Sequence, residues 1–137
     1  MRLLKAIPWF GFGLFLILHG IAHSPAILGS WKLLDSIEDV SRQPNILLTN
    51  AGDGLIYVLG FFWLLAAVSF VIAGIAVLRT AYWWPMAVSL AIVLSLPMTM
   101  LWREDAVIGL IINALILAGM SGYFLIGIQQ NRAGKLA

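Results

Sequence analysis

Two histidines, His19 and His23, stand four residues apart in the apolar run 14–28 and are the only histidines of the chain. In a helix, residues four apart lie on one face, one turn from each other. The pair therefore offers two nitrogen ligands to a metal ion, or two hydrogen-bonding groups to an organic ligand. Ionisable side chains within an apolar span are functional candidates by default, and their structural alternative is hydrogen bonding between helices.

Other polar side chains are expected at the same depth as the histidines. From the helical rise, His19 lies about 15 Å and His23 about 9 Å below the outer end of the first span, and Asn113 about 10 Å inside the last span. The ligand or metal candidates are His19, His23, Asn113, Asp53, Asp105 and Glu104, and the expected pocket lining is Phe12, Phe15, Leu16, Ser95 and Thr99. For Asn113, Ser95 and Thr99, hydrogen bonding between helices is the simpler role, and Asp53 stands where a helix N-cap is expected.

Three kinds of ligand follow from a histidine pair. A divalent metal would need a third ligand, for example an outer carboxylate, and the segment HGIAH lacks the glutamate of the HExxH protease motif. Haem is not expected within a single chain, because both imidazoles lie on one helix and cannot approach opposite faces of the iron. The remaining reading is a quinone or lipid-like ligand, with its polar end at the imidazoles and its body among the phenylalanines.

The composition places the chain in a membrane. Of its 137 residues, 62% are hydrophobic and 10% are charged, it has no cysteine, and its mean hydropathy is +1.00. We predict an all-α integral membrane four-helix bundle, a single domain over residues 1–137. The spans are expected at about 7–29, 55–78, 83–101 and 106–128, with Pro25 kinking or ending the first one. An outer segment, 30–50, is predicted to contain a short interfacial helix.

The charges predict the orientation of the bundle. One side of the membrane would carry five cations and no acid, namely Arg2, Lys5, Arg79, Arg132 and Lys135. The other side would carry all six acids with Lys32, Arg42 and Arg103. The positive-inside rule then places both termini in the cytoplasm and the histidines in the outer half of a bacterial cytoplasmic (inner) membrane, as part of a multi-pass protein. No basic patch with interleaved aromatic residues is present, so nucleic acid is not expected as a partner.

Small residues recur along the second span. Gly60, Ala67 and Gly74 are seven apart and therefore share one face. In lipid, such a stripe lets another helix approach closely, so we expect these residues to serve helix packing.

Several segments together resemble a group of small, uncharacterised bacterial four-helix membrane proteins. They are LHGIAH at 18–23, AGDG at 51–54, GFFWLLAA at 60–67, Trp83-Trp84, and WREDAVIGLIIN at 102–113. In layout the chain is similar to the DoxX-like proteins, some of which are associated with quinone-linked redox chemistry. The resemblance implies the four-helix fold and marks His19, His23, Asp53, Asp105 and Asn113 as motif positions.

These observations predict a small membrane protein that binds an apolar ligand or a metal ion in an outer-half pocket built on His19 and His23. The alternative is a non-catalytic accessory subunit that packs against a larger membrane complex. Membrane lipids are expected partners in either case, and a homo-oligomer is compatible with both. Nothing in the sequence identifies a reaction.

Overall fold

The computed structural model describes residues 2–33 and 42–133, and their side chains over 8–33 and 42–129. The described residues form helices joined by turns and one longer loop, without a β-strand. The helices are α1 (Arg2–Ile21), α2 (Ser24–Ser30), α3 (Asp53–Leu78), α4 (Trp84–Leu101) and α5 (Val107–Ala133). Four segments are long and apolar enough to cross a membrane: Pro8–Ser30, Asp53–Leu78, Trp84–Leu101 and Val107–Gln129. The prediction of an all-helical chain with four spans is confirmed.

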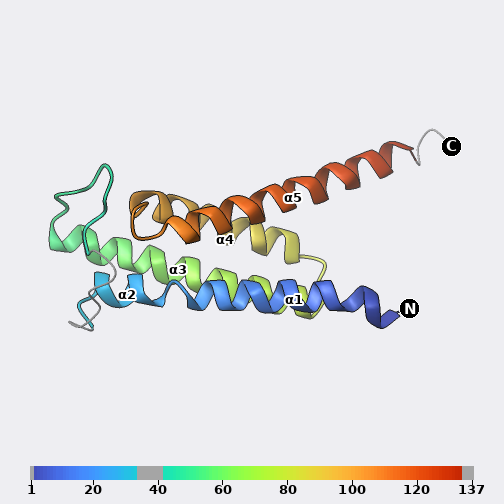
Figure 1. Ribbon diagram of the computed structural model, residues 1–137, viewed down its shortest axis with the longest axis horizontal. Helices are drawn as coiled ribbons and strands as arrows, with labels where there is room; N and C mark the ends of the chain where they lie inside the picture. The colour runs from blue at the N-terminus through green and yellow to red at the C-terminus, as the bar shows by residue number, and fades with distance from the viewer. Residues whose placement is uncertain (1, 34–41, 134–137) are drawn as a thin grey trace.

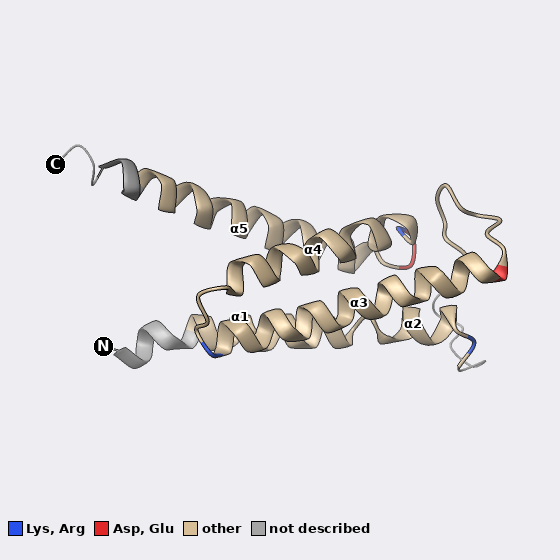
Figure 2. Ribbon diagram, turned by 180° about the vertical axis from the view of Figure 1, so that it is seen from behind, with Lys and Arg blue, Asp and Glu red and all other residues tan. Residues whose placement is uncertain are grey.

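The long helices pack in the order in which they occur along the chain. The α3 helix packs along α1, α2 and α4, and α5 packs along α4 (Figure 1). The free ends of α1 and α5 lie at the same end of the molecule. Figure 2 shows α3 running from the opposite end, where Asp53 begins it, to the end that carries both termini, where Arg79 follows it. The four spans thus follow one another around the bundle in chain order, and the first and the last face each other.

The first span, Pro8–Ser30, consists of two helices with a break close to Pro25, the residue that was predicted to kink or end it. The α1 helix ends at Ile21, and α2 begins at Ser24 with Pro25 in its first turn. Pro25 has no backbone N–H and therefore cannot donate to the carbonyl of Ile21, whereas the first turn of a new helix tolerates proline. Consequently His23 sits at the break between the two helices, in the apolar part of the span.

Small residues bring the first two spans into close contact. A Cβ atom on Gly74 would lie 2.5 Å from the carbonyl oxygen of Gly13, and one on Gly20 would lie 2.6 Å from that of Ala67. Gly60 lies against the side chain of Trp31, beyond α2. Gly60, Ala67 and Gly74 therefore all face the first span, and two of them meet glycines of α1.

The outer segment between the first two spans is described only in part. Residues 34–41, which carry most of the expected interfacial helix, lie outside the described residues, and 42–52 form bends and turns. The backbone N–H groups of Asn45 and Ile46 donate to the carbonyl of Leu101, at 2.8 and 3.2 Å. This loop therefore packs over the end of α4, and it places the α4–α5 turn at the same end of the molecule as Asp53.

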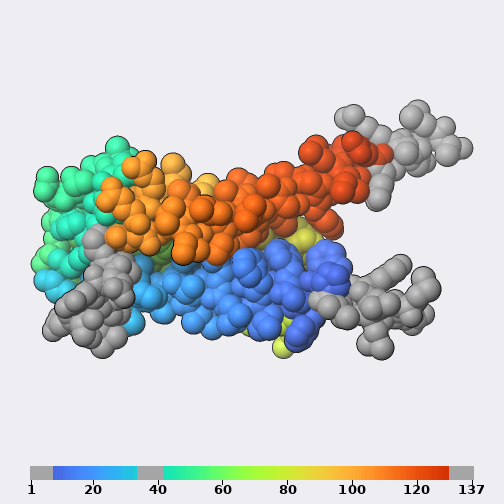
Figure 3. All heavy atoms as spheres, viewed as in Figure 1, coloured from blue at the N-terminus to red at the C-terminus, as the bar shows by residue number. Residues whose placement is uncertain are grey.

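The apolar core has two parts. One cluster includes Leu16, Phe70 and Val88, and the other includes Ile56, Trp63 and Trp102. On the face seen in Figure 3, α1 and α5 lie side by side and diverge towards the end that carries the termini. The two histidines lie at the junction of these clusters, because both rings contact Phe70 of the first cluster and His23 also contacts Trp63 of the second.

Candidate functional site

A chain of hydrogen bonds joins the first, third and fourth spans. His19 Nε2 lies 3.2 Å from Asn113 Oδ1, and Asn113 Nδ2 donates to Ser95 Oγ at 2.9 Å and to Thr99 Oγ1 at 3.3 Å. Ser95 Oγ in turn lies 3.0 Å from His23 Nε2. All five residues are buried. We call His19, His23, Ser95, Thr99 and Asn113 the polar cluster.

The geometry of Thr99 determines how the Asn113 amide is oriented. The Thr99 hydroxyl donates to the backbone carbonyls of Ser95 and Leu96, at 3.1 and 3.0 Å, so its oxygen accepts from Asn113. With the amide nitrogen towards Ser95 and Thr99, both amide hydrogens have acceptors. Turned over, the amide would leave one N–H without an acceptor in the core, which is costly. Asn113 Oδ1 therefore faces His19, and His19 Nε2 must be the donor.

The same reasoning gives the two neutral histidines opposite tautomers. Ser95 Oγ accepts from Asn113, and among the described residues the Ser95 hydroxyl hydrogen has His23 Nε2 as its acceptor, which assigns an unprotonated Nε2 to His23. Neutral His23 carries its proton on Nδ1, whereas neutral His19 carries it on Nε2 and has a bare Nδ1. Neither Nδ1 atom has a hydrogen-bond partner among the residues that the structure describes. The pair thus retains one free donor and one free acceptor.

Aromatic rings hold the two imidazoles in place. The ring centroid of Phe70 lies 4.6 Å from that of His19 and 5.8 Å from that of His23, both in edge-to-face contact. Trp63 lies 5.2 Å from His23, and the two histidine rings are 4.9 Å apart. Phe15 stacks on His19, with their ring centroids 6.1 Å apart. Such contacts restrict ring rotation and so favour a preformed site.

Both histidines line a cavity of about 240 Å³, which we call the histidine pocket. Thr99 and Asp105 are its other polar residues, and Ala22 and Pro25 bring the break between α1 and α2 to its wall. The remaining walls are apolar and include Ala26, Trp63, Trp102, Gly109 and Ile112. Ligand sites for drug-sized molecules are roughly 300–1,000 Å³, so this pocket suits a group of about one ring.

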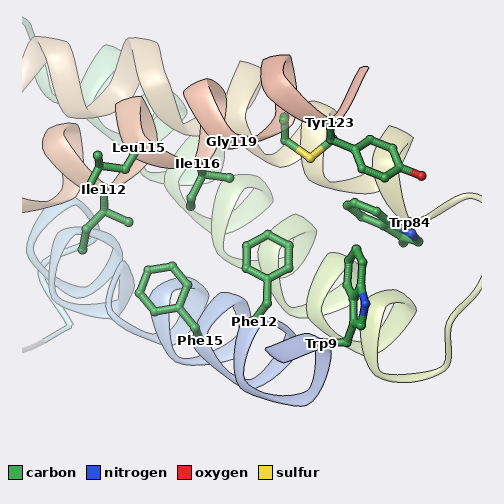
Figure 4. Close-up of a pocket in the computed structure, with 10 residues that line it drawn as sticks. Trp9, Phe12, Phe15, Trp84, Ile112, Leu115, Ile116, Gly119 and Tyr123 are labelled. Carbon is green, nitrogen blue, oxygen red and sulfur yellow. The ribbon is translucent and has the colours of Figure 1, made fainter. Parts of the chain in front are cut away.

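A larger cavity, of about 380 Å³, lies between α1 and α5 and is here called the aromatic groove. Its walls come from Trp9, Phe12 and Phe15 on α1, Trp84 on α4, and Ile112, Leu115, Ile116, Gly119, Met120 and Tyr123 on α5 (Figure 4). Phe12 and Phe15, which were predicted to line the histidine site, line this groove instead. The spacing of Trp9, Phe12 and Phe15, three residues apart, is the sequence signal that could have indicated it.

Three predicted site residues lie elsewhere. Asp53 is exposed and forms ion pairs with Arg42 at 2.6 Å and Lys32 at 3.3 Å, and its side chain makes no N-cap bond. Glu104 is exposed on the α4–α5 turn. Leu16 is fully buried in the core beside Phe70 rather than at a cavity. These residues were predicted from their expected depth in the membrane, but depth does not specify which way a side chain points.

The donor set favours an organic ligand over a metal ion. In residues 2–33 and 42–133, no three His, Asp or Glu side chains are grouped so that they could hold a metal together. In addition, Nε2 of each histidine already bonds a neutral side chain of the cluster. Of the predicted carboxylates, only Asp105 lines the histidine pocket.

Comparison of the chain with protein-family models, with curated proteins and with solved structures gives no match.

Proposed function

We propose that this membrane protein binds a small ligand of the quinone class in the histidine pocket. The observation that carries the proposal is that neither Nδ1 atom of the two pocket histidines has a hydrogen-bond partner among the described residues. The tautomers assigned above make one of these atoms a donor and the other an acceptor. A quinone carbonyl would accept from Nδ1–H of His23, and a hydroxyl of the reduced form would donate to Nδ1 of His19. The apolar and aromatic walls would enclose the ring.

Two further features support this choice. The indole N–H of Trp63, which is buried beside the pocket, has no hydrogen-bond acceptor within the described part of the chain and is a second donor close by. The resemblance in layout to DoxX-like proteins agrees with a quinone ligand, and membership of that group is itself a proposal. A metal ion is the less supported ligand, because the histidines lack a third donor.

Binding can be measured through the tryptophans that line the pocket. We expect 2,3-dimethoxy-5-methyl-1,4-benzoquinone to quench Trp63 and Trp102 fluorescence saturably in the purified protein, with a Kd of roughly 10–100 µM for so small a molecule. The control is the double variant Trp63→Phe/Trp102→Phe, in which the saturable component should disappear. Quenching that rises only linearly with concentration, equally in both proteins, would show that the pocket does not bind the quinone.

We also propose that both termini are cytoplasmic and that the histidine pocket lies in the outer half of a bacterial inner membrane. Arg79 lies at the end that carries the termini, and the described acids Asp53, Glu104 and Asp105 lie at the opposite end (Figure 2). The positive-inside rule supports this orientation.

The absence of cysteine from the sequence allows a direct test of the orientation. Leu47 and Tyr82 lie towards opposite ends and are 86% and 95% exposed, so each accepts a cysteine without disturbing the core. In intact cells, a membrane-impermeant maleimide should label Leu47→Cys at least about tenfold faster than Tyr82→Cys. Opening the cells should equalise the two rates. Faster labelling of Tyr82→Cys in intact cells would reverse the orientation.

An accessory role in a larger complex is the second candidate. The observation that favours it is the low burial of the last span, of which 17% is buried compared with 44% of α3. Much apolar surface of α5 is therefore left for lipid or for a partner. Stoichiometric co-purification with a larger membrane protein, together with unchanged behaviour after loss of both histidines, would favour this role over ligand binding.

A further inference from the structure

The histidine pocket adjoins the aromatic groove. Ile112 lines both cavities. Phe15, which lines the groove, stacks on His19, which lines the pocket, with their planes 7° apart. The two cavities are therefore adjacent in the space between the first and the last span.

The groove exists because α1 and α5 are held by different neighbours. The α1 helix packs along α3 and α5 packs along α4, so side chains rather than close backbone packing occupy the space between them. Figure 4 shows Phe12 and Phe15 on one side of this space and Ile112 and Ile116 on the other. At the far end, Trp84 contacts Trp9 and Tyr123, with ring centroids 5.3 and 5.1 Å apart. The distance from His19 to Trp9 along the helix is about 15 Å.

The residues that line the two cavities become less polar from the histidine pocket to the aromatic groove. The end at the histidines has hydrogen-bonding groups, and the groove beyond Phe15 is lined by apolar and aromatic side chains up to Trp84. The carboxylate of Asp105, an exposed residue that also lines the pocket, disfavours a phosphate or carboxylate headgroup there, because like charges repel. The space therefore matches a neutral polar head that carries a hydrocarbon chain.

We infer that the ligand is a neutral single-chain amphiphile, with its ring in the histidine pocket and its hydrocarbon chain in the aromatic groove. This inference rests on the proposed function and adds to it the chain and its course. The chain runs between α1 and α5 from Ile112 towards Trp84 and the end of the bundle that carries the termini.

Gly119 allows the groove to be filled without touching the histidines. It lines the groove, and a Cβ atom placed on it meets no other atom within 4 Å, so Gly119→Phe is expected to fold. Leu115→Trp, at a residue that is 67% exposed and lines the same groove, is a second blocking variant. Gly127→Phe is the matched control, because Gly127 lies on the same helix with equally open surroundings and lines neither cavity.

The test compares the head-only benzoquinone with the same ring bearing a decyl chain, by tryptophan quenching in one detergent. Gly119→Phe and Leu115→Trp should weaken binding of the decyl compound at least about tenfold and change that of the head-only compound less than about twofold. Gly127→Phe should change neither. Each compound is compared between proteins in the same detergent, so its partitioning into micelles affects all the measured affinities equally.

The other outcomes are decisive as well. If the blocking variants bind the decyl compound normally, the chain does not occupy the groove, although the proposed pocket stands. If they instead alter the oligomeric state with both affinities intact, a second copy of the protein occupies the groove and the inference is overturned. If the unmodified protein binds neither compound, the proposed function fails and the inference fails with it.

Discussion

Replacing His23 with Leu together with Ser95→Ala is expected to weaken benzoquinone binding at least about tenfold while the protein remains folded. Nδ1–H of His23 is the donor assigned to the quinone carbonyl. Leucine has no such donor and fills a similar volume with an apolar side chain. Ser95→Ala removes the hydroxyl that would otherwise lose its acceptor. Asn113 keeps Thr99 and His19 as partners but loses the acceptor of one amide hydrogen, so the double variant should be less stable than the unmodified protein. Quenching titrations give the affinity, and thermal unfolding in detergent gives the stability.

The single variants separate binding from folding. His23→Leu alone leaves the Ser95 hydroxyl buried without an acceptor, so it should destabilise the protein by about 1–3 kcal/mol. Ser95→Ala on that background removes this hydroxyl but also the acceptor of one Asn113 N–H, so it should leave the stability near that of the single variant. Ser95→Ala alone keeps His23 and should still bind the quinone. Native affinity in the double variant would show that His23 does not contact the ligand.

The largest loss of stability is expected from Gly74→Leu. A Cβ atom at this position would lie 2.5 Å from the carbonyl oxygen of Gly13 and 2.6 Å from the Ile17 side chain. The carbonyl belongs to helix backbone and cannot move away alone, so α1 and α3 must separate along their length. We expect a loss of about 3 kcal/mol, near the upper end for overpacking, measured by unfolding of the purified protein in mixed micelles.

The matched control for this variant is Gly127→Leu, because a Cβ atom there meets open space. It should be neutral or slightly stabilising, since leucine is a better helix former than glycine. Equal stability of the two variants would mean that α1 and α3 do not pack through their glycines. Gly74→Leu should also weaken quinone binding indirectly, because moving α1 carries His19 away from Asn113.

Much of the polar cluster follows from arithmetic on the sequence. Spans of known length and a rise of 1.5 Å per residue set the depth of His19, Ser95, Thr99 and Asn113, and the structure brings these side chains together. Buried polar groups seek one another in an apolar layer, so residues at one depth are natural partners. The glycine stripe on α3 was predictable for a related reason, since its period of seven keeps it on one face.

What the sequence left open depends on direction and on long-range packing. Asp53 lies near the expected level but pairs with Arg42 and Lys32, and that choice depends on how the outer loop folds back. Pro25 indicated a kink or an end of the first helix, and the break lies at Ala22 and His23 because the effect of Pro25 reaches back to the carbonyl four residues earlier. The aromatic groove could not be derived from spacing alone, because it requires knowing that α1 faces α5.

The order of packing along the chain has a consequence for biosynthesis. Each span packs mainly on the one synthesised before or after it, so those contacts can form as the spans enter the bilayer one by one. The bond between His19 and Asn113 joins residues 94 positions apart, and it must wait until the final span has been inserted. A nascent chain released before Asn113 would hold His19 without its amide partner, so the completed site distinguishes the finished protein from its truncated precursors.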